Sequence, residues 1–94
     1  MRPHAPYDIN IFLSQNLHYP ESARKMGIEG RVIVRFIVDE NGNIRQPEMI
    51  RSPDSSLTNE AMRVMKLMPK WIPGKNGGKF VALAFTMPII FKLD

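Results

Sequence analysis

Cysteine is absent from the 94 residues, which excludes disulfides, thiol catalysis and thiolate metal sites together. This absence fits a reducing compartment and equally a periplasmic domain without crosslinks, so it does not fix the location. The only histidines, His4 and His18, do not have the spacing of zinc ligands. No serine has a base that the sequence places beside it, and no acidic pair can be assigned to a cleft. We therefore expect no enzyme activity, no metal and no cofactor.

Long hydrophobic runs and tracts of one charge are also missing. No apolar run approaches the ~20 residues of a membrane helix, so we expect no direct membrane insertion of this segment. The net charge of +4 comes from lysines and arginines spread from Arg2 to Lys92. Such a spread indicates a solvated surface, and we expect no nucleic-acid partner. The glycines and lysines of residues 74–79 do not have the spacing of a phosphate-binding loop and predict a turn.

The chain has the length of one small domain. Residues 1–7, with two prolines, predict a linker remnant or a disordered lead-in, and residues 8–94 form the predicted domain. Asp8 can cap a short helix. We expect this helix to end between Asn16 and Tyr19, because Pro20 disfavours a helical residue before it, and to pack near the sheet. Pro20 suits the start of a second helix, with Ala23 and Met26 facing inward. Gly27 suits its left-handed C-terminal cap.

Residues 31–38 are the most β-prone stretch and predict the central strand. Its inward residues are expected to be Val32, Val34, Phe36 and Val38. The pair Asn41-Gly42 predicts a hairpin turn with positive φ angles at both positions. The partner strand, residues 44–52, contains Pro47, and a proline places a strand at a sheet edge.

A helix over residues 57–68 is predicted from apolar residues at helical spacing, with Ser55 or Ser56 as its N-cap. Trp71 follows and is expected to anchor the core. After a flexible loop over residues 75–78, residues 80–93 predict one long strand, because their odd positions are all large and apolar. The predicted fold class is α+β: a small three-stranded antiparallel sheet with helices packed on one face, in the order helix, helix, strand, strand, helix, strand.

Several short motifs occur in an order that resembles one known family. They are Tyr19-Pro20, Ala23, Gly27, Gly30-Arg31-Val32, Asn41-Gly42, Ser52, Leu57, Glu60-Ala61, the run from Met68 to Gly74, Gly78-Lys79, Phe85-Thr86 and Pro88-Ile89. This pattern resembles the C-terminal domain family of TonB, the energy transducer of Gram-negative bacteria, over about residues 9–93. Two residues depart from the family pattern: Phe80 stands where a proline is usual, and Pro47 where a valine is usual.

The resemblance implies a periplasmic domain whose parent protein is anchored in the inner membrane by a helix and a proline-rich spacer upstream of Met1. It implies two partners: the TonB box of outer-membrane transporters, which adds as a strand beside the last strand, and inner-membrane motor proteins contacted through the upstream part. Energy from the proton gradient would pass through the chain. The alternative is a TonB-like sensory or structural domain of another membrane protein, binding peptidoglycan or an envelope protein.

The residues themselves also point to strand addition. Pro88 marks the last strand as an edge strand, and Pro47 blunts the opposite edge, so the last strand is left open. The predicted peptide-binding edge consists of Phe80, Val81, Ala82, Leu83, Ala84, Phe85, Thr86 and Met87. In a regular ladder Ala82, Ala84 and Thr86 would offer their main-chain groups to the peptide, whereas a bulge would reverse part of this assignment.

Two further expectations concern the surroundings of this edge. Arg31 and Arg35 on the central strand are possible partner contacts, and simple solvation of the sheet face is the alternative. Because an open apolar edge can pair with its own copy, the sequence leaves both a monomer and an edge-paired dimer open.

Overall fold

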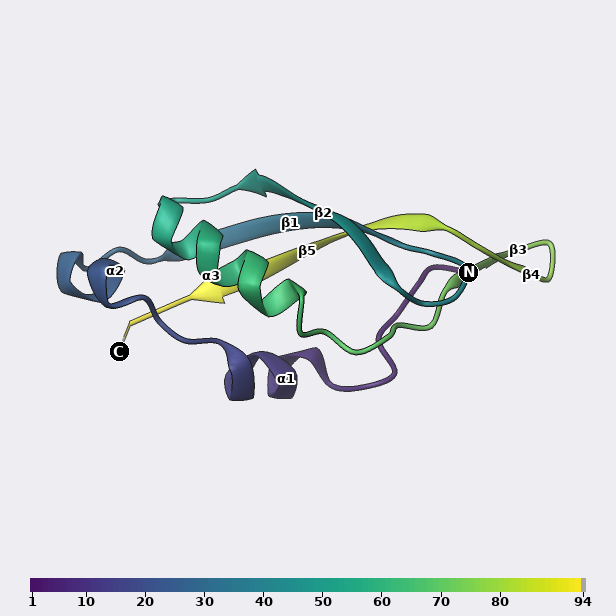
Figure 1. Cartoon of the computed structure of the whole chain (residues 1–94), viewed down its shortest axis with the longest axis horizontal. Coiled ribbons are helices and arrows are strands. Elements are labelled where there is room, and N and C mark those ends of the chain that lie inside the picture. The colour runs from purple at the N-terminus through teal and green to yellow at the C-terminus, as the bar shows by residue number, and fades with distance from the viewer. Residues whose placement is uncertain (94) are drawn as a thin grey trace.

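The centre of the structure is a three-stranded antiparallel sheet in the order β2-β1-β5. The computed structural model describes residues 1–93; residue 94, the last of the predicted domain, lies outside the described part. The elements are α1 (Ile9–Asn16), α2 (Glu21–Met26), β1 (Gly30–Val38), β2 (Ile44–Arg51), α3 (Ser55–Met65), β3 (Gly74–Asn76), β4 (Lys79–Val81) and β5 (Leu83–Phe91), as Figure 1 shows. The predicted α+β class is confirmed.

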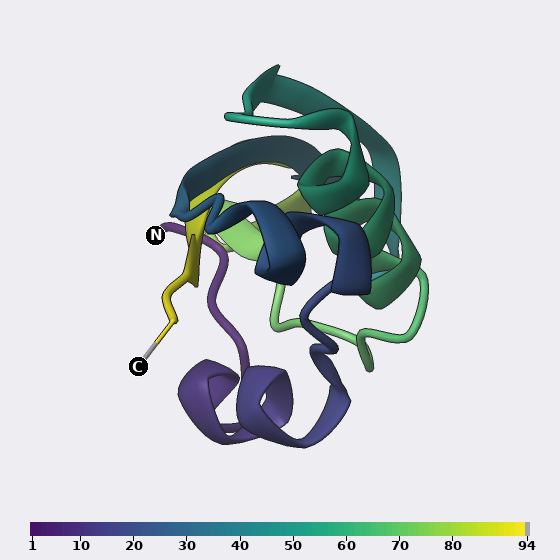
Figure 2. The same cartoon turned by 90° about the vertical axis from the view of Figure 1, so that its left-hand side faces the viewer.

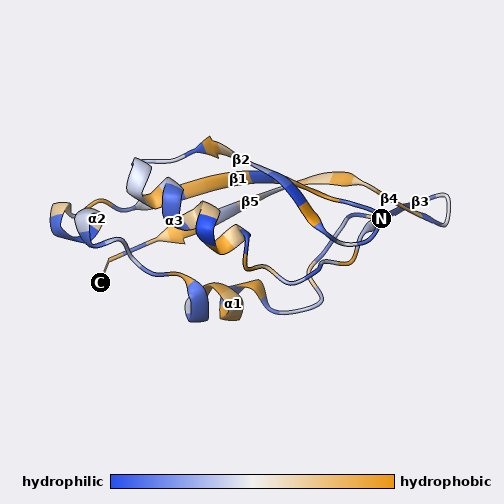
Figure 3. Cartoon of the chain, viewed as in Figure 1, coloured by the Kyte–Doolittle hydropathy of each residue, from blue (hydrophilic) through white to orange (hydrophobic). Residues whose placement is uncertain are grey.

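The hydrophobic core lies between this sheet and α3. The alternate residues Val32, Val34, Phe36 and Val38 of β1 are fully buried, as predicted. The buried face of α3 consists of Leu57, Ala61, Val64 and Met65. Viewed along the long axis, the sheet curves over α2 and α3, and α1 lies below them (Figure 2). Figure 3 shows the apolar residues concentrated along β1 and alternating with polar residues along the helices.

Trp71 anchors the core where the chain leaves α3, which confirms the prediction for this residue. Its side chain is 2% exposed, and its ring centroid lies 5.2 Å from that of Phe36 and 5.0 Å from that of Phe85. Edge-to-face contacts of this kind add to the burial of apolar area. The tryptophan therefore connects the central strand to the first half of β5.

The hairpin between β1 and β2 is organised by the buried carboxylate of Asp39. This carboxylate accepts hydrogen bonds from the main-chain N–H groups of Asn41 (3.0 Å) and Asn43 (2.8 Å) and from Nε of Arg45 (2.7 Å). The bond from Arg45, followed by the two main-chain bonds, holds the pKa of Asp39 below its usual value. Only Gly42 has a positive φ in this turn, at 87°. The prediction for Asn41 was wrong, because the carboxylate stabilises a turn that needs one left-handed residue.

The strand β2 lies at the second edge of the sheet, as the proline predicted. Gln46, directly before Pro47, has a φ of 50°, and the pairing with β1 shifts register between Arg35 and Ile37. An irregular strand that contains proline is a poor template for a further strand. The two edges of the sheet are therefore unlike.

Both predicted ends of α3 need correction. The N-cap is Asp54, whose carboxylate accepts from the main-chain N–H of Ser56 at 3.0 Å, rather than Ser55 or Ser56. The helix ends at Met65 instead of Met68. Residues 66–68 tighten into a turn in which Leu67 N–H bonds to the carbonyl of Val64, three residues back. Pro69 disfavours a helical residue before it, which explains the early end.

In α2 the inward face is smaller than predicted. Ala23 is buried, but Met26 is 76% exposed. Gly27 forms the left-handed cap as expected (φ 67°), and the N–H of Ile28 bonds back to the carbonyl of Ala23 at 2.9 Å. Ile28 then packs against the core. The residue after the cap thus takes the position expected for Met26.

The predicted long strand over residues 80–93 is interrupted. Its first residues form β4, Ala82 lies outside any strand, and β5 ends at Phe91. The segment expected to be a flexible loop, residues 75–78, belongs to a second antiparallel hairpin, β3–β4. Gly77 (φ 59°) and Gly78 (φ 80°) form its two-residue turn. Two glycines in succession permit such a tight hairpin turn.

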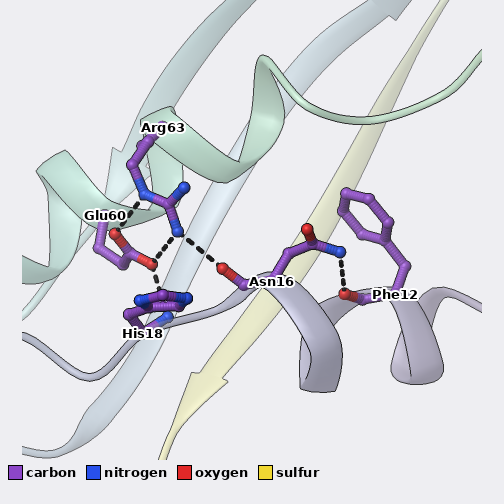
Figure 4. A network of polar contacts seen from close by, with 5 residues as sticks. All are labelled: Phe12, Asn16, His18, Glu60 and Arg63. Carbon is purple, nitrogen blue, oxygen red and sulfur yellow. Dashed lines mark hydrogen bonds and ion pairs between the residues drawn. The ribbon is translucent and has the colours of Figure 1, made fainter.

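The helix α1 has no fully buried residue, although Ile9 packs against the core, and polar contacts join its C-terminal end to α3 (Figure 4). The guanidinium of Arg63 on α3 donates to the carbonyl of Asn16 at 2.7 Å. The carboxylate of Glu60 accepts from the main-chain N–H of His18 at 2.6 Å and pairs with Arg63 at 2.8 Å. These contacts place α1 beside the sheet, below β5.

Candidate functional site

The strand β5 has one open edge. It pairs with β1 on one side, and no other strand within residues 1–93 pairs with its second side. The pairing with β1 is continuous over nine residue pairs, from Val38 opposite Leu83 to Gly30 opposite Phe91, without a bulge. The edge opposite β1 is therefore regular along its length.

The register determines which residues turn their main-chain groups toward this open edge. Neighbouring residues of an antiparallel strand direct these groups to opposite sides. Pro88, opposite Ile33, has no N–H to give, so its position belongs to the set that faces away from β1. Ala84 and Thr86 share the parity of Pro88. We therefore expect their N–H and C=O groups to face outward.

In the hairpin β3–β4, the main-chain groups of neighbouring residues also point alternately to the two sides of each strand. The main-chain N–H of Lys75 donates to the carbonyl of Met1 at 2.9 Å, so Lys75 faces the N-terminal segment and not its partner Phe80. By the alternation rule, Phe80 then turns its main-chain groups to the free side of β4. Its ring is half exposed and covered by the ammonium of Lys75 at 4.8 Å.

The residues of the predicted peptide-binding edge are divided between two strands. Phe80 and Val81 lie in β4, Ala82 lies between the strands, and residues 83–87 form the first half of β5. Of their side chains, Met87 is buried and Phe85 is half-buried in the core. Leu83 is 38% exposed. The assignment of this edge to peptide binding stays a prediction.

Arg31 and Arg35 lie on the exposed face of β1, one strand away from the open edge. Arg35 is opposite Thr86 on β5 and opposite Glu48 on β2, and Arg31 is opposite Ile90. Neither arginine forms an ion pair with any residue of 1–93. Their proposed contacts with a partner would require that partner to extend over this face.

Two concavities along β5 were not expected from the sequence. The first, of about 270 Å³, lies between α1 and the second half of β5 and is lined by Asn10, Leu13, Ser14, Leu17, Pro88 and Ile90. The second, of about 400 Å³, is lined by Arg2, Pro3 and residues 83–86. Figure 2 shows the N-terminal segment and α1 beside and below β5. Both depend on the packing of distant segments, for which the sequence carries no local signal.

The N-terminal segment, residues 1–7, makes defined contacts in the structure. His4 and Ile72 exchange two main-chain hydrogen bonds, of 3.0 and 2.7 Å. Met1 pairs in the same way with Lys75, and the hydroxyl of Tyr7 donates to the carbonyl of Pro69. This segment therefore lies antiparallel to residues 72–75, on the far side of β3 from β4.

The described part of the chain offers no grouping of three His, Asp or Glu side chains for a metal ion. Within residues 1–93, no helix has the length and apolar character to cross a membrane.

Comparison with known proteins agrees with this architecture. The model of the Gram-negative bacterial TonB protein C-terminal family matches residues 15–93. The chain is 36% identical over 78 residues to Protein TonB of Pseudomonas aeruginosa and 38% identical over 77 residues to Protein TonB of Vibrio cholerae. Each match covers 81% of this chain but only 22% and 31% of the relatives. The chain thus spans less than a third of these proteins.

Solved structures give the same result. A solution structure of the Pseudomonas aeruginosa TonB C-terminal domain superposes with a TM-score of 0.64 at 33% identity, covering 82% of this chain and 78% of that one. A Helicobacter pylori TonB C-terminal domain superposes with a TM-score of 0.57 at 25% identity and covers 92% of both chains. With the family match over most of its length, the chain belongs to the TonB C-terminal domain family.

Proposed function

We propose that this chain is the periplasmic C-terminal domain of a TonB-type energy transducer. It binds the TonB box of outer-membrane transporters by strand addition and passes on energy derived from the proton-motive force. The family membership supports the transducer class. The strand-addition step rests on one observation, the open and regular edge of β5.

Strand addition suits a domain that must recognise several peptide segments that differ in sequence. Main-chain hydrogen bonds give affinity whatever the side chains are, and pockets beside the edge give selectivity. In this proposal the edge of β5 forms the main-chain hydrogen bonds, and the two concavities along it receive side chains of the added segment. The irregular edge of β2 offers no equivalent template, so a single segment binds at one place.

Amide hydrogen exchange during titration with a TonB-box peptide tests this proposal. Exchange at Ala82, Ala84 and Thr86 is expected to slow on binding, because their N–H groups gain partners. Exchange at Phe85 and Met87 is expected to change little, because we assign their N–H groups to the ladder with β1. No protection at any of these three amides with several such peptides would reject the proposal and favour a sensory or structural domain that binds peptidoglycan or an envelope protein.

Transmission of force involves the parent protein. The curated relatives are more than three times the length of the matched segment, and in our proposal their additional part corresponds to an inner-membrane anchor and a spacer that contacts the motor proteins. A force applied to that spacer would be transmitted to this domain through the N-terminal segment, residues 1–7, and then through the sheet to the peptide on β5.

A further inference from the structure

The concavity between the N-terminal segment and β5 contains one charged side chain. Its lining consists of Arg2, Pro3 and residues 83–86, of which only Arg2 carries a charge. Arg2 is exposed and forms no ion pair with any other residue of 1–93. A cation thus lies beside the open edge, in a concave surface that supplies no counter-charge.

We propose that Arg2 is a specificity-determining residue that recognises an acidic side chain of the segment added to β5. This inference rests on the proposed function, since it concerns the partner of the same edge. The acid lies at the end of the bound segment opposite residues 83–86, before Pro88. For a segment parallel to β5 this is its N-terminal end, and for an antiparallel segment it is its C-terminal end.

The position of Arg2 is set by the pairing of its neighbours. Met1 and His4 are held by main-chain hydrogen bonds to Lys75 and Ile72, and Pro3 is buried. Gly74 allows the close approach: a Cβ there would lie 2.8 Å from the carbonyl oxygen of Met1 and 2.4 Å from the side chain of Leu83. The N-terminal segment and the start of β5 are therefore packed around the same glycine.

The chemistry of the guanidinium favours a carboxylate as its partner. Its planar N–H groups match the two oxygens of a carboxylate, which gives directional as well as electrostatic selectivity. In a concave surface that excludes part of the solvent, the attraction is less screened than on a convex one. An uncharged amide of the same shape retains the hydrogen bonding but loses the charge.

Paired peptides measure this selectivity. The probes are extended eight-residue peptides with one glutamate at the N-terminal or the C-terminal end, and the same peptides with glutamine instead. Titration calorimetry is expected to show one glutamate peptide binding about three- to fivefold tighter than its glutamine counterpart, as for an exposed ion pair. In Arg2→Gln this ratio is expected to fall to about one.

The control variant is Lys66→Gln, which removes the same charge from an exposed residue at the end of α3. It is expected to retain the preference for glutamate. Equal ratios in the original chain and in Arg2→Gln would overturn the inference, as would equal losses in both variants, which would indicate a general charge effect.

A second pair of variants tests the part played by the N-terminal segment. His4→Pro removes the N–H that bonds to Ile72, whereas His4→Ala keeps it. His4→Pro is expected to reduce the preference for glutamate, and His4→Ala to retain it. If His4→Pro instead tightens binding of both peptides, the N-terminal segment obstructs the edge and the inference is wrong.

Hydrogen exchange separates failure of this inference from failure of the proposed function. Protection of Ala84 and Thr86 by the glutamine peptide would support the proposed function even if Arg2 had no effect. No protection by any peptide would reject the proposed function and the role of Arg2 together.

Discussion

Gly42 is the residue at which the first hairpin meets the aromatic core. Its N–H donates to the carbonyl of Asp39 at 2.9 Å, and its own carbonyl accepts from the N–H of Trp71 at 3.0 Å. A Cβ at this position would lie 2.3 Å from the carbonyl oxygen of Trp71. The turn therefore needs glycine for two reasons, the positive φ and the close approach of a second segment.

A comparison of two glycines separates these reasons. Gly77 also has a positive φ (59°), but a Cβ there would meet nothing within 4 Å. We expect Gly77→Ala to lower the free energy of unfolding by about 1 kcal/mol, the cost of a left-handed alanine. Gly42→Ala should lower it by about 3 kcal/mol or more, because main-chain atoms must also shift. Urea unfolding measures both, and equal losses would show that the contact with Trp71 does not matter.

Among the elements, β5 has two roles. Its buried side chains hold it in the core, and the main chain of alternate residues is available for a partner strand. The side chains of Met87, Ile89 and Phe91 are buried in the core. The main chain of the alternate residues faces the open edge, by the argument from Pro88. One strand can therefore be held by the fold and still be available to a partner.

Proline substitutions on β5 test this division. Ala84→Pro removes an outward N–H and is expected to weaken peptide binding about five- to tenfold, as for one lost hydrogen bond. It should leave the fold largely intact, because proline is tolerated where the N–H faces away from the ladder. Phe85→Pro removes an N–H assigned to the ladder with β1 and should destabilise the fold strongly. Thermal unfolding measures the loss of stability in each variant, and titration calorimetry measures the loss of peptide affinity. If Ala84→Pro destabilised the fold more than Phe85→Pro, the N–H groups would face the opposite sides from those assigned here.

At the scale of the whole molecule, the polar network around Glu60 joins the N-terminal helices to the core. Glu60 accepts from Arg63 and from His18 N–H, and Arg63 donates to Asn16 (Figure 4). The bond from Arg63, against the opposing effect of burial, holds the pKa of Glu60 below its usual value. Since α1 has no buried side chain, this network contributes to the position of α1 below β5.

The network makes stability depend on pH in a definite direction. Because the pKa of Glu60 is lower in the folded state than its usual 4.5, its stabilising effect is complete above that value and is lost as the pH falls through the folded pKa. Glu60→Ala is expected to lower the free energy of unfolding by about 1–2 kcal/mol at pH 7 and by much less at pH 3. Urea titrations at both values measure this.

Glu40 provides the matched control, since it is exposed and makes no hydrogen bond or ion pair through its side chain within residues 1–93. Glu40→Ala is expected to change stability little at either pH. A loss for Glu60→Ala that is the same at pH 7 and pH 3 would mean that packing of the side chain, and not its charge, is responsible.

The periodic patterns of the chain predicted much of the fold. Alternation along β1 identified its buried residues, helical spacing identified α3, and the two prolines Pro47 and Pro88 identified the edge strands. These features are local, because the period of a strand or helix and the missing N–H of proline act within a few residues. The ends of elements were predicted less accurately. Asp54, Ser55 and Ser56 are all residue types that cap helices, and the structure has Asp54 as the N-cap of α3.

Residue patterns alone were enough to predict the family, the order of the main elements and which strand has an open edge. What surrounds that edge became clear only from the folded chain. The pairing of residues 1–4 with residues 72–75 and the concavities beside β5 join segments far apart in the chain. Contacts of that kind depend on where the core places each segment, and no local pattern of residues encodes them.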